Sequence, residues 1–352
     1  MSLNDSRKTR ALFLGFGNVG REVAKILFEE KQNYPKLKDL NISIVGIITK
    51  SHGSLVNQSG VDVPKALRDI RDLGRFSPSS PEFVALSGIE AVRQLDYDAL
   101  VELTTLSIEE RGEPALSHVR EALGRGRHVV TANKAPAAFA YQELQDLARN
   151  RGVKFLHEST VMDGTPVFNL AKSGLKGCTI RGVSGVLNST TNFVLSRMEQ
   201  GESLEASVKV AQKEGFAEAD PSHDLEGWDA AAKITVLANA LMGASLTPFD
   251  VDRNGISLVT VEDAQKAIRS GKRLKLICKA WREDNTVKAR VCLEEVEQGH
   301  PFAPIRESGS ILMIETDLLA PFVITETDPT LRDTAYGVIN DLLDLSAGEN
   351  LP

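Results

Sequence analysis

The fold is decided by residues 11–29, ALFLGFGNVGREVAKILFE. The apolar run Ala11–Gly15 is typical of a buried strand, and Asn18–Glu29 is expected to form a helix. Between them lies a GxGxxG turn, Gly15-Phe16-Gly17-Asn18-Val19-Gly20. Its first glycine would permit the tight turn, its second the approach of a pyrophosphate, and its third close packing of helix against strand. Because the helix start also offers free N–H groups to an anion, we expect these six residues to bind a dinucleotide.

Strands and helices alternate through the rest of the first 157 residues. Further strands are expected over residues 42–48, 97–103, 128–131 and 154–157. Further helices are expected over residues 114–123 and 141–150. This alternation predicts parallel βαβ units and therefore an α/β domain with a doubly wound, Rossmann-type sheet over residues 1–157.

The pattern changes after residue 158. Strands are expected over residues 179–187, 272–281, 287–295 and 311–315, and helices over 192–198, 204–214, 228–242 and 334–345. The last three of these strands follow one another without intervening helices, which favours an α+β domain with an antiparallel sheet over residues 158–320. The remaining segment, 321–352, is expected to return to the nucleotide-binding domain.

Composition excludes several classes of function. The 352 residues are 42% hydrophobic, which is ordinary for a soluble globular protein, and their formal charge of −7 argues against nucleic acid as the main partner, so a small-molecule ligand must be inferred from the motifs. No apolar run reaches transmembrane length, and the polar start predicts no signal peptide. Three widely spaced cysteines indicate structural thiols in a reducing compartment, so we expect a cytoplasmic protein without a membrane partner.

Three further segments bear on the cofactor. The second strand ends in Ile48-Thr49-Lys50 rather than in the acidic residue that grips the ribose of NAD, so Thr49 and Lys50 favour NADP, with NAD also possible. Thr104 follows the strand expected at 97–103 and is assigned to the same ligand-binding edge. Lys134 follows the strand expected at 128–131, where it could reach cofactor or substrate, although a solvated lysine is the simpler interpretation.

The segment 218–233, EADPSHDLEGWDAAAK, places five carboxylates ahead of one lysine. Asp229 and Lys233 lie one helical turn apart, on a stripe that continues with apolar residues. Lysine suits the interconversion of an alcohol and a carbonyl, because the protonated amine is an acid at neutral pH. The other carboxylates could hold a substrate ammonium group. An ordinary ion pair at a helix start, or a divalent-metal site, remains as an alternative.

Together these motifs resemble homoserine dehydrogenase. The matching segments occur in the family's order at residues 15–20, 112–115, 128–134, 157–166, 188–192 and 218–233. The resemblance implies reversible NAD(P)-dependent interconversion of L-homoserine and L-aspartate 4-semialdehyde, in threonine and methionine biosynthesis. It makes Lys233 the acid/base, with Asp229 beside it, and Lys134 a second active-site lysine. It implies that Glu218 and Asp224 bind the substrate amine and that Thr190 lines the pocket.

The family also implies a monovalent cation, usually sodium, held by backbone carbonyls. The matching positions are Glu158, Val161, Asp163 and Thr165. The resemblance further assigns substrate binding, catalysis and dimerisation to residues 158–320, so a homodimer is expected. A small ligand-sensing domain, present in some relatives, is not expected.

The chain departs from the family pattern chiefly at residues 325–334, where TETDPTLRDT replaces a glycine-rich loop and would add charge near the cofactor. Ser189, in place of a usual glycine, alters the pocket loop. Two alternatives therefore stay open. One is a related oxidoreductase acting on another amino alcohol or amino aldehyde, and the other is a non-catalytic NADP-binding protein.

Overall fold

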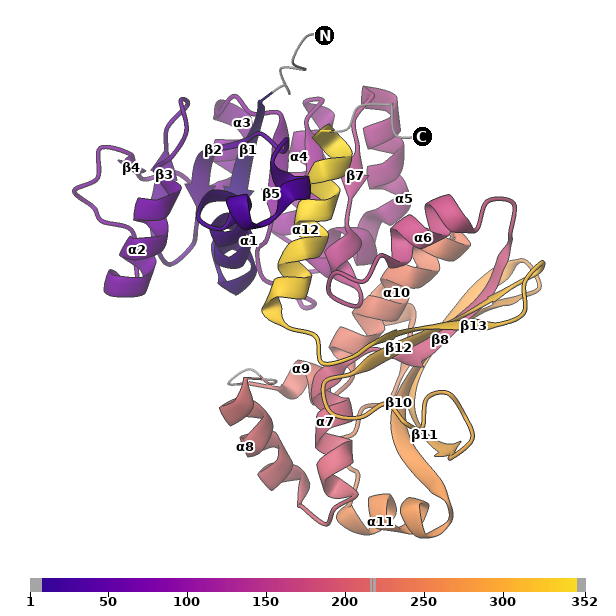
Figure 1. Ribbon diagram of the computed structural model, residues 1–352. Coiled ribbons are helices and arrows are strands. Elements are labelled where there is room, and N and C mark those ends of the chain that lie inside the picture. Colours follow the sequence, from indigo (N-terminus) through magenta and orange to yellow (C-terminus); the bar gives the residue numbers. More distant parts are fainter. Residues whose placement is uncertain (1–7, 216, 218–219, 347–352) are drawn as a thin grey trace. The chain divides into compact units, whose positions relative to one another are not determined.

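The computed structural model describes residues 8–215, 217 and 220–346. The chain divides into two compact units, each built around its own sheet (Figure 1). Unit 1 combines the residues up to Pro166 with those from Thr330 onward, and unit 2 comprises Val167–Pro329. No described helix combines the length and the apolar character that crossing a membrane requires.

The sheet of unit 1 has the strand order β4-β3-β2-β1-β5-β6-β7. Its strands are β1 (Thr9–Leu14), β2 (Ile42–Ile48), β3 (Ser54–Val56), β4 (Phe83–Val84), β5 (Ala99–Glu102), β6 (His128–Thr131) and β7 (Phe155–Leu156). Each strand in the series β2-β1-β5-β6-β7 pairs in parallel with its neighbour, whereas β3 and β4 form an antiparallel edge beside β2. Every residue of β2 is buried, as expected for an interior parallel strand.

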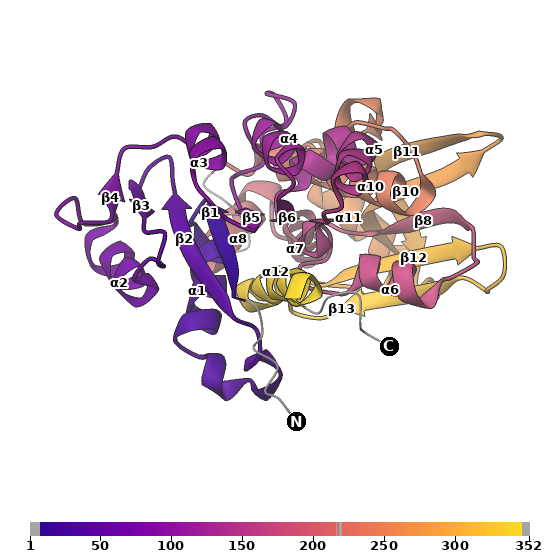
Figure 2. The same cartoon turned by 90° about the horizontal axis from the view of Figure 1, so that it is seen from above.

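Helices cover both faces of this sheet. They are α1 (Asn18–Phe28), η1 (Lys31–Asn33), η2 (Pro35–Leu37), α2 (Val63–Leu73), α3 (Gly88–Gln94), α4 (Ala115–Gly124), α5 (Lys134–Arg151), η3 (Glu158–Thr160) and α12 (Leu331–Ser346). Figure 2 shows α3, α4 and α5 on one face and α1 with α12 on the other. The prediction of a doubly wound, Rossmann-type domain is therefore confirmed.

The sheet of unit 2 has the order β13-β12-β8-β10-β11-β9. Its strands are β8 (Ile180–Val186), β9 (Asp252–Arg253), β10 (Lys272–Glu283), β11 (Thr286–Glu297), β12 (Ser310–Thr316) and β13 (Phe322–Glu326). Neighbouring strands pair antiparallel, except that the two-residue β9 lies parallel to β11. The α+β class expected for this part of the chain is confirmed.

The helices of unit 2 pack mainly around β8, β10 and β11. They are α6 (Val167–Gly174), α7 (Ser189–Met198), α8 (Leu204–Glu214), α9 (Ser222–Leu225), α10 (Trp228–Met242), η4 (Pro248–Asp250) and α11 (Val261–Arg269). Helix α10 is buried along most of its length, because alanine and β-branched residues dominate its sequence. Gly227, the residue immediately before this helix, has φ of 83°, which lies in the left-handed region that favours glycine.

Candidate active site

The glycine turn between β1 and α1 has the geometry that its sequence predicts. Gly15 has φ of 91°, and a Cβ there would lie 2.5 Å from the carbonyl oxygen of Leu103. A Cβ on Gly20 would lie 3.2 Å from the carbonyl oxygen of Gly15, so this glycine lets helix and strand approach closely. A Cβ on Gly17 would meet no described heavy atom within 4 Å. Because protein packing does not require Gly17, approach of a ligand is the reason that remains.

The residues expected to meet the ribose follow β2 directly. The Thr49 hydroxyl donates to the Gly53 carbonyl at 2.7 Å and accepts from the His52 N–H at 2.8 Å. Thr49 therefore closes the turn after β2, a structural role that the sequence did not reveal. Lys50 is exposed at the same turn.

A buried carboxylate joins the ends of β5 and β6. Glu102 accepts hydrogen bonds from the Thr104 N–H at 3.1 Å, from the Thr104 hydroxyl and from the Thr131 hydroxyl. Burial raises the pKa of Glu102 to about 7, although these hydrogen bonds act to lower it. Asn133 extends the network, because its amide donates to Thr104 and its side-chain oxygen caps α5 through the Ala135 N–H.

This network fixes the place of Lys134. Lys134 is the first residue of α5 and directly follows the capping Asn133. Thr104 and Lys134, predicted independently, are thus tied to one hydrogen-bonded cluster at the carboxyl ends of β5 and β6. In parallel sheets this edge is where ligands bind.

In unit 2 the predicted lysine and aspartate form an ion pair. The Lys233 ammonium lies 3.3 Å from the Asp229 carboxylate, and each side chain is only 16% exposed. The same ammonium donates to the Leu187 carbonyl at 2.6 Å, at the end of β8. Lys233 is therefore held between α10 and the segment that leads into α7, and it is not a solvated surface lysine.

Asp224 and Thr190 belong to the same cluster. Thr190 is buried and donates a hydrogen bond to Asp224. Burial and the charge of Asp229 raise the pKa of Asp224. Hydrogen bonds from Asn188 and Thr190 act against that rise. The structure thus brings together four of the residues predicted for catalysis and substrate binding: Thr190, Asp224, Asp229 and Lys233.

The other carboxylates of the 218–233 segment behave differently. Glu218 lies outside the described residues. Asp220 is exposed and accepts from the Ser222 N–H at 3.1 Å, at the start of α9. Glu226 is exposed at the end of α9. Within the described ranges, no group of three or more metal-ligating side chains is present.

The segment expected to hold a cation is a tight loop in unit 1. Met162 and Asp163 have φ of 55° and 50°, so two successive residues are left-handed. The Thr165 N–H closes the turn on the Met162 carbonyl at 2.8 Å. Side chains of Glu158 and Val161 are buried, while Asp163 and Thr165 are partly exposed.

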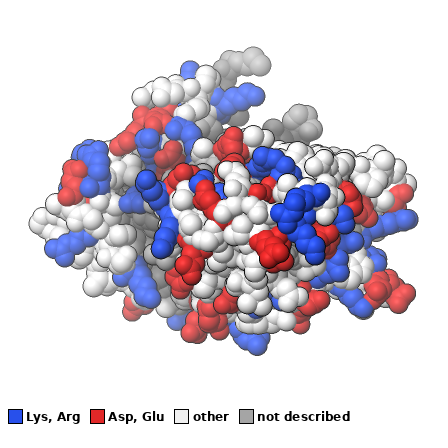
Figure 3. All heavy atoms as spheres, turned by 90° about the horizontal axis from the view of Figure 1, so that it is seen from below, with Lys and Arg blue, Asp and Glu red and all other residues white. Residues whose placement is uncertain are grey.

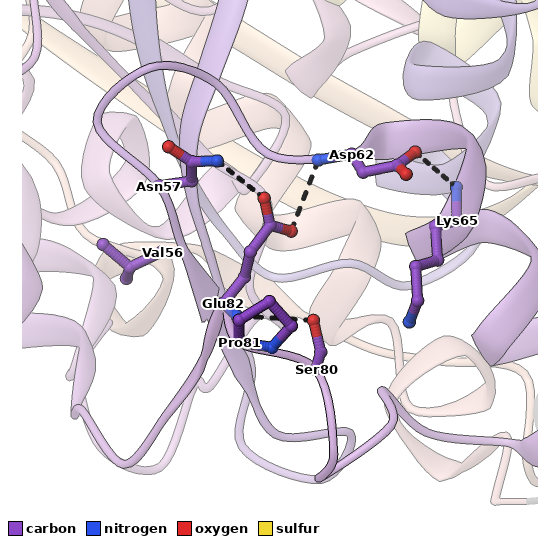
Figure 4. A pocket seen from close by; sticks show the side chains of 7 residues that line it. All are labelled: Val56, Asn57, Asp62, Lys65, Ser80, Pro81 and Glu82. Carbon is purple, nitrogen blue, oxygen red and sulfur yellow. Dashed lines mark hydrogen bonds between the residues drawn. The ribbon is translucent and has the colours of Figure 1, made fainter.

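A pocket of about 430 Å³ lies elsewhere in unit 1 (Figure 4). It is lined by Val56, Asn57, Asp62, Lys65, Ser80, Pro81 and Glu82. The Asn57 N–H donates to the carbonyl of Val45, at the middle of β2, whereas Thr49 and Lys50 follow the end of that strand. None of the predicted site residues lines this pocket, so it is separate from the predicted cofactor edge.

In the divergent segment at 325–334, Arg332 and Asp333 have their charges engaged within unit 1. The Arg332 guanidinium pairs with Glu22, with Glu30 and with the Tyr34 hydroxyl. Asp333 accepts from the N–H and hydroxyl of Thr330 at 2.7 Å, at the start of α12. The guanidinium expected near the cofactor therefore ties α12 to α1 and the segment that follows it.

On the face seen in Figure 3, acidic and basic side chains are interspersed rather than gathered into one basic region.

The two units carry different chemistry. Unit 1 has the dinucleotide turn and its ligand-binding edge, and unit 2 has a lysine with two carboxylates. Fold and site together define the class of nicotinamide-dependent oxidoreductases.

Comparisons with known proteins identify the family. Residues 166–343 match the family model described as homoserine dehydrogenase, and residues 15–158 match that for the NAD-binding domain of homoserine dehydrogenase. The chain is 35% identical to the homoserine dehydrogenase of Methanocaldococcus jannaschii, over 95% of this chain and 97% of the relative. The chain belongs to the homoserine dehydrogenase family.

Two further comparisons concern the cofactor. The NAD(+)-dependent homoserine dehydrogenase of Pseudomonas canavaninivorans is 36% identical over 94% of both chains. A hyperthermophilic archaeal homoserine dehydrogenase in complex with NADPH has a TM-score of 0.80 at 25% identity, covering 96% of this chain and 97% of that one. Binding of NAD(P) is therefore a property that relatives of this chain share.

Proposed function

We propose that this protein is a homoserine dehydrogenase that interconverts L-homoserine and L-aspartate 4-semialdehyde. The observation that carries the proposal is the largely buried Lys233–Asp229 pair beside Asp224. In reduction, the Lys233 ammonium donates a proton to the aldehyde oxygen, and in oxidation the amine accepts the hydroxyl proton. Bound nicotinamide supplies or accepts the hydride.

The substrate amine is assigned to the carboxylates. Asp224 lies beside Asp229, and the side chains that donate hydrogen bonds to it, Asn188 and Thr190, are neutral. Because these donors do not cancel its negative charge, Asp224 can attract an ammonium group. Glu218 joins it in this proposal on the strength of the family motif. Asp229 positions Lys233, Thr190 orients Asp224, and Lys134 serves the cofactor and the reacting end of the substrate.

NADP is proposed as the preferred cofactor. Thr49 and the exposed Lys50 follow β2, where an enzyme selective for NAD carries an acidic side chain. A lysine at this position would attract the 2′-phosphate. The complex of a relative with NADPH supports this choice, whereas the name of the Pseudomonas relative supports NAD.

A monovalent cation is proposed for the loop at 158–165. The candidate ligands are the main-chain carbonyls of Glu158, Val161, Asp163 and Thr165. Hard cations take oxygen ligands, and a closed turn with two left-handed residues holds carbonyls in fixed positions. The loop is held further by the Glu158 N–H, which donates to Asp341 of α12.

A homodimer is proposed through the β12–β13 hairpin. Leu318, Leu319 and Val323 are 70%, 50% and 41% exposed on this hairpin. Exposed apolar side chains gathered at a sheet edge mark an interaction surface. Light scattering on the purified protein would test this through the mass of the particle.

A cytoplasmic location is proposed because the three cysteines form no disulfide.

The function is tested by a spectrophotometric assay of the purified protein. Oxidation of NADPH with aspartate semialdehyde is expected, as is reduction of NADP+ with L-homoserine near pH 9. A panel of other amino alcohols would separate homoserine dehydrogenase from a relative with another substrate. Activity with none of these substrates would refute the proposed function.

A further inference from the structure

The strongest unassigned feature of the carboxylate cluster is Asn188, between β8 and α7. Its amide nitrogen donates to the Asp224 carboxylate at 2.7 Å and to the Asp229 carboxylate at 3.0 Å. Its side-chain oxygen accepts from the Thr191 N–H at 2.8 Å and from the Thr191 hydroxyl at 2.8 Å. One buried amide therefore contacts both carboxylates and the start of a helix.

The orientation of this amide is determined by its partners. A main-chain N–H can only donate, so the atom facing the Thr191 N–H must be the amide oxygen. An ionised carboxylate can only accept, so the two carboxylates require the NH₂ group. The cap of α7 thus fixes the direction in which Asn188 presents its two N–H groups.

The cluster has an electrostatic problem that Asn188 addresses. Asp224 and Asp229 lie side by side, and one ammonium group, that of Lys233, pairs with Asp229 at 3.3 Å. Like charges at close range favour protonation of one carboxylate. If both stay ionised, the three side chains carry one net negative charge, which complements the single positive charge of a substrate amine. If Asp224 takes up a proton, that complement is lost.

We propose that Asn188 is a positioning residue that keeps Asp224 and Asp229 ionised side by side and so preserves the negative charge that binds the substrate ammonium group. This inference rests on the proposed function. A shared donor stabilises both carboxylates in their charged form, because hydrogen bonds to an ionised group are stronger than those to a neutral one. It also explains why an asparagine stands here, since serine or aspartate would cap α7 equally well.

Other titratable groups that face the cluster, within the described ranges, do not replace this role. Burial raises the pKa of the Cys278 thiol on β10 to about 12, so Cys278 is neutral across the working range. The charged members of the cluster itself are Asp224 on α9 and Asp229 with Lys233 on α10. The ionisation that governs substrate binding is therefore that of Asp224, whose pKa burial already raises.

The test is the pH profile of kcat/KM for L-homoserine in the wild type, Asn188→Ser and Asn188→Asp. Serine keeps an oxygen that caps α7 but removes both amide donors, and aspartate keeps the cap but adds a third carboxylate. We expect the acid limb of the profile to move up by about one pH unit in Asn188→Ser and further in Asn188→Asp. KM should rise about tenfold at pH values below the limb, with a smaller change in kcat.

Ser203→Ala is the matched control, because Ser203 caps α8 through the Ala206 N–H. This variant loses a helix cap and should leave the acid limb in place. An unchanged limb in both Asn188 variants would overturn the inference, as would a fall in kcat that is uniform across pH. If the wild type itself does not turn over homoserine, the proposed function fails and the inference with it.

Discussion

At the scale of single residues, the site depends on charged side chains that folding brings out of water. Lys233 is held by the Leu187 carbonyl and by Asp229, so its ammonium is fixed in place before any substrate arrives. Fixed donors contribute to catalysis because no reorganisation is needed as charge develops. Asp224 gains the same rigidity from Asn188 and Thr190.

The assignment of NADP makes a prediction about Lys50. Replacing it with glutamate should raise KM for NADP+ by about tenfold or more, because a charge-assisted contact with the 2′-phosphate is lost and repulsion replaces it. KM for NAD+ should change little. Lys38→Glu, at another exposed lysine of unit 1, is the control. Equal effects on both cofactors would refute the role assigned to Lys50.

A second prediction concerns Lys275, which is buried on β10 and donates to Asn192 at 2.7 Å and to the Ile305 carbonyl. The pKa of Lys275 is lowered to about 8, chiefly by burial; the charge of Glu199 acts to raise it, and the charges of Arg273 and Arg306 act with burial to lower it. The native state therefore disfavours the charged form. Burial of the charged ammonium group therefore destabilises the native state fully below about pH 8. This destabilisation decreases as pH rises toward 10.5, the ordinary pKa of lysine that applies in the unfolded chain.

Urea unfolding of the wild type and Lys275→Met across pH would measure this effect. The stability of the wild type relative to the variant should increase between about pH 8 and 10, by up to about 3 kcal/mol. A difference that stays constant over this range would show that Lys275 titrates normally.

At the scale of elements, helix α12 is held on the loop at 158–165 by close backbone contact. A Cβ on Gly164 would lie 2.1 Å from the Asp333 carbonyl oxygen, and one on Gly337 would lie 2.3 Å from the Ser159 hydroxyl oxygen. Two hydrogen bonds add to this contact, from Ser159 to the Thr334 carbonyl and from Thr334 to Asp163, both at 2.7 Å. The proposed cation loop is therefore supported by a helix that lies far away in sequence.

Gly337→Ala should lower the free energy of unfolding by about 1–3 kcal/mol, since the added methyl group overpacks this contact. Thermal unfolding followed by circular dichroism would measure the loss. Gly124→Ala is the matched control, because a Cβ at this helical glycine would meet no described heavy atom within 4 Å. The control should be neutral or slightly stabilising, and equal losses in both variants would contradict the packing argument.

Sequence patterns predicted the longer elements well. The strand and helix on either side of the glycine turn were expected over 11–15 and 18–29 and lie at Thr9–Leu14 and Asn18–Phe28. The helix expected at 228–242 was found with those bounds. Strong periodicity, a glycine turn and clear flanking residues explain these successes.

Short or weakly patterned elements were not predicted. β3 and β4 have three and two residues, which is too few for a periodic signal. Helices α2 and α11 did carry signals, since Asp62 caps the first and Thr260 forms a capping box with Asp263 in the second. These caps could have been recognised from sequence.

The site was predicted where one segment contained its residues, as with Asp229 and Lys233. Contacts between distant segments were not foreseen. Asn188 is 36 residues from Asp224, and Lys275 is 83 residues from Asn192. No role for Glu102 was predicted from the sequence, because its hydrogen bonds with the residues after β5 and at the end of β6 depend on strand pairing.

At the scale of the whole molecule, the chain separates two kinds of chemistry between two units. Unit 1 carries the glycine turn and the Glu102 network, and unit 2 carries the lysine with its carboxylates. This division predicts that a change in the chemistry of unit 2 can leave cofactor binding by unit 1 intact.

The most direct test is Lys233→Met, assayed for turnover with L-homoserine and for NADPH binding by fluorescence. The methionine side chain is unbranched like that of lysine and only one heavy atom shorter, but it cannot carry a proton. We expect turnover to fall by a factor of about 10² or more, the usual contribution of a general acid–base group, while NADPH binds as it does to the wild type. Undiminished turnover in Lys233→Met would contradict the assignment of Lys233 as the acid/base.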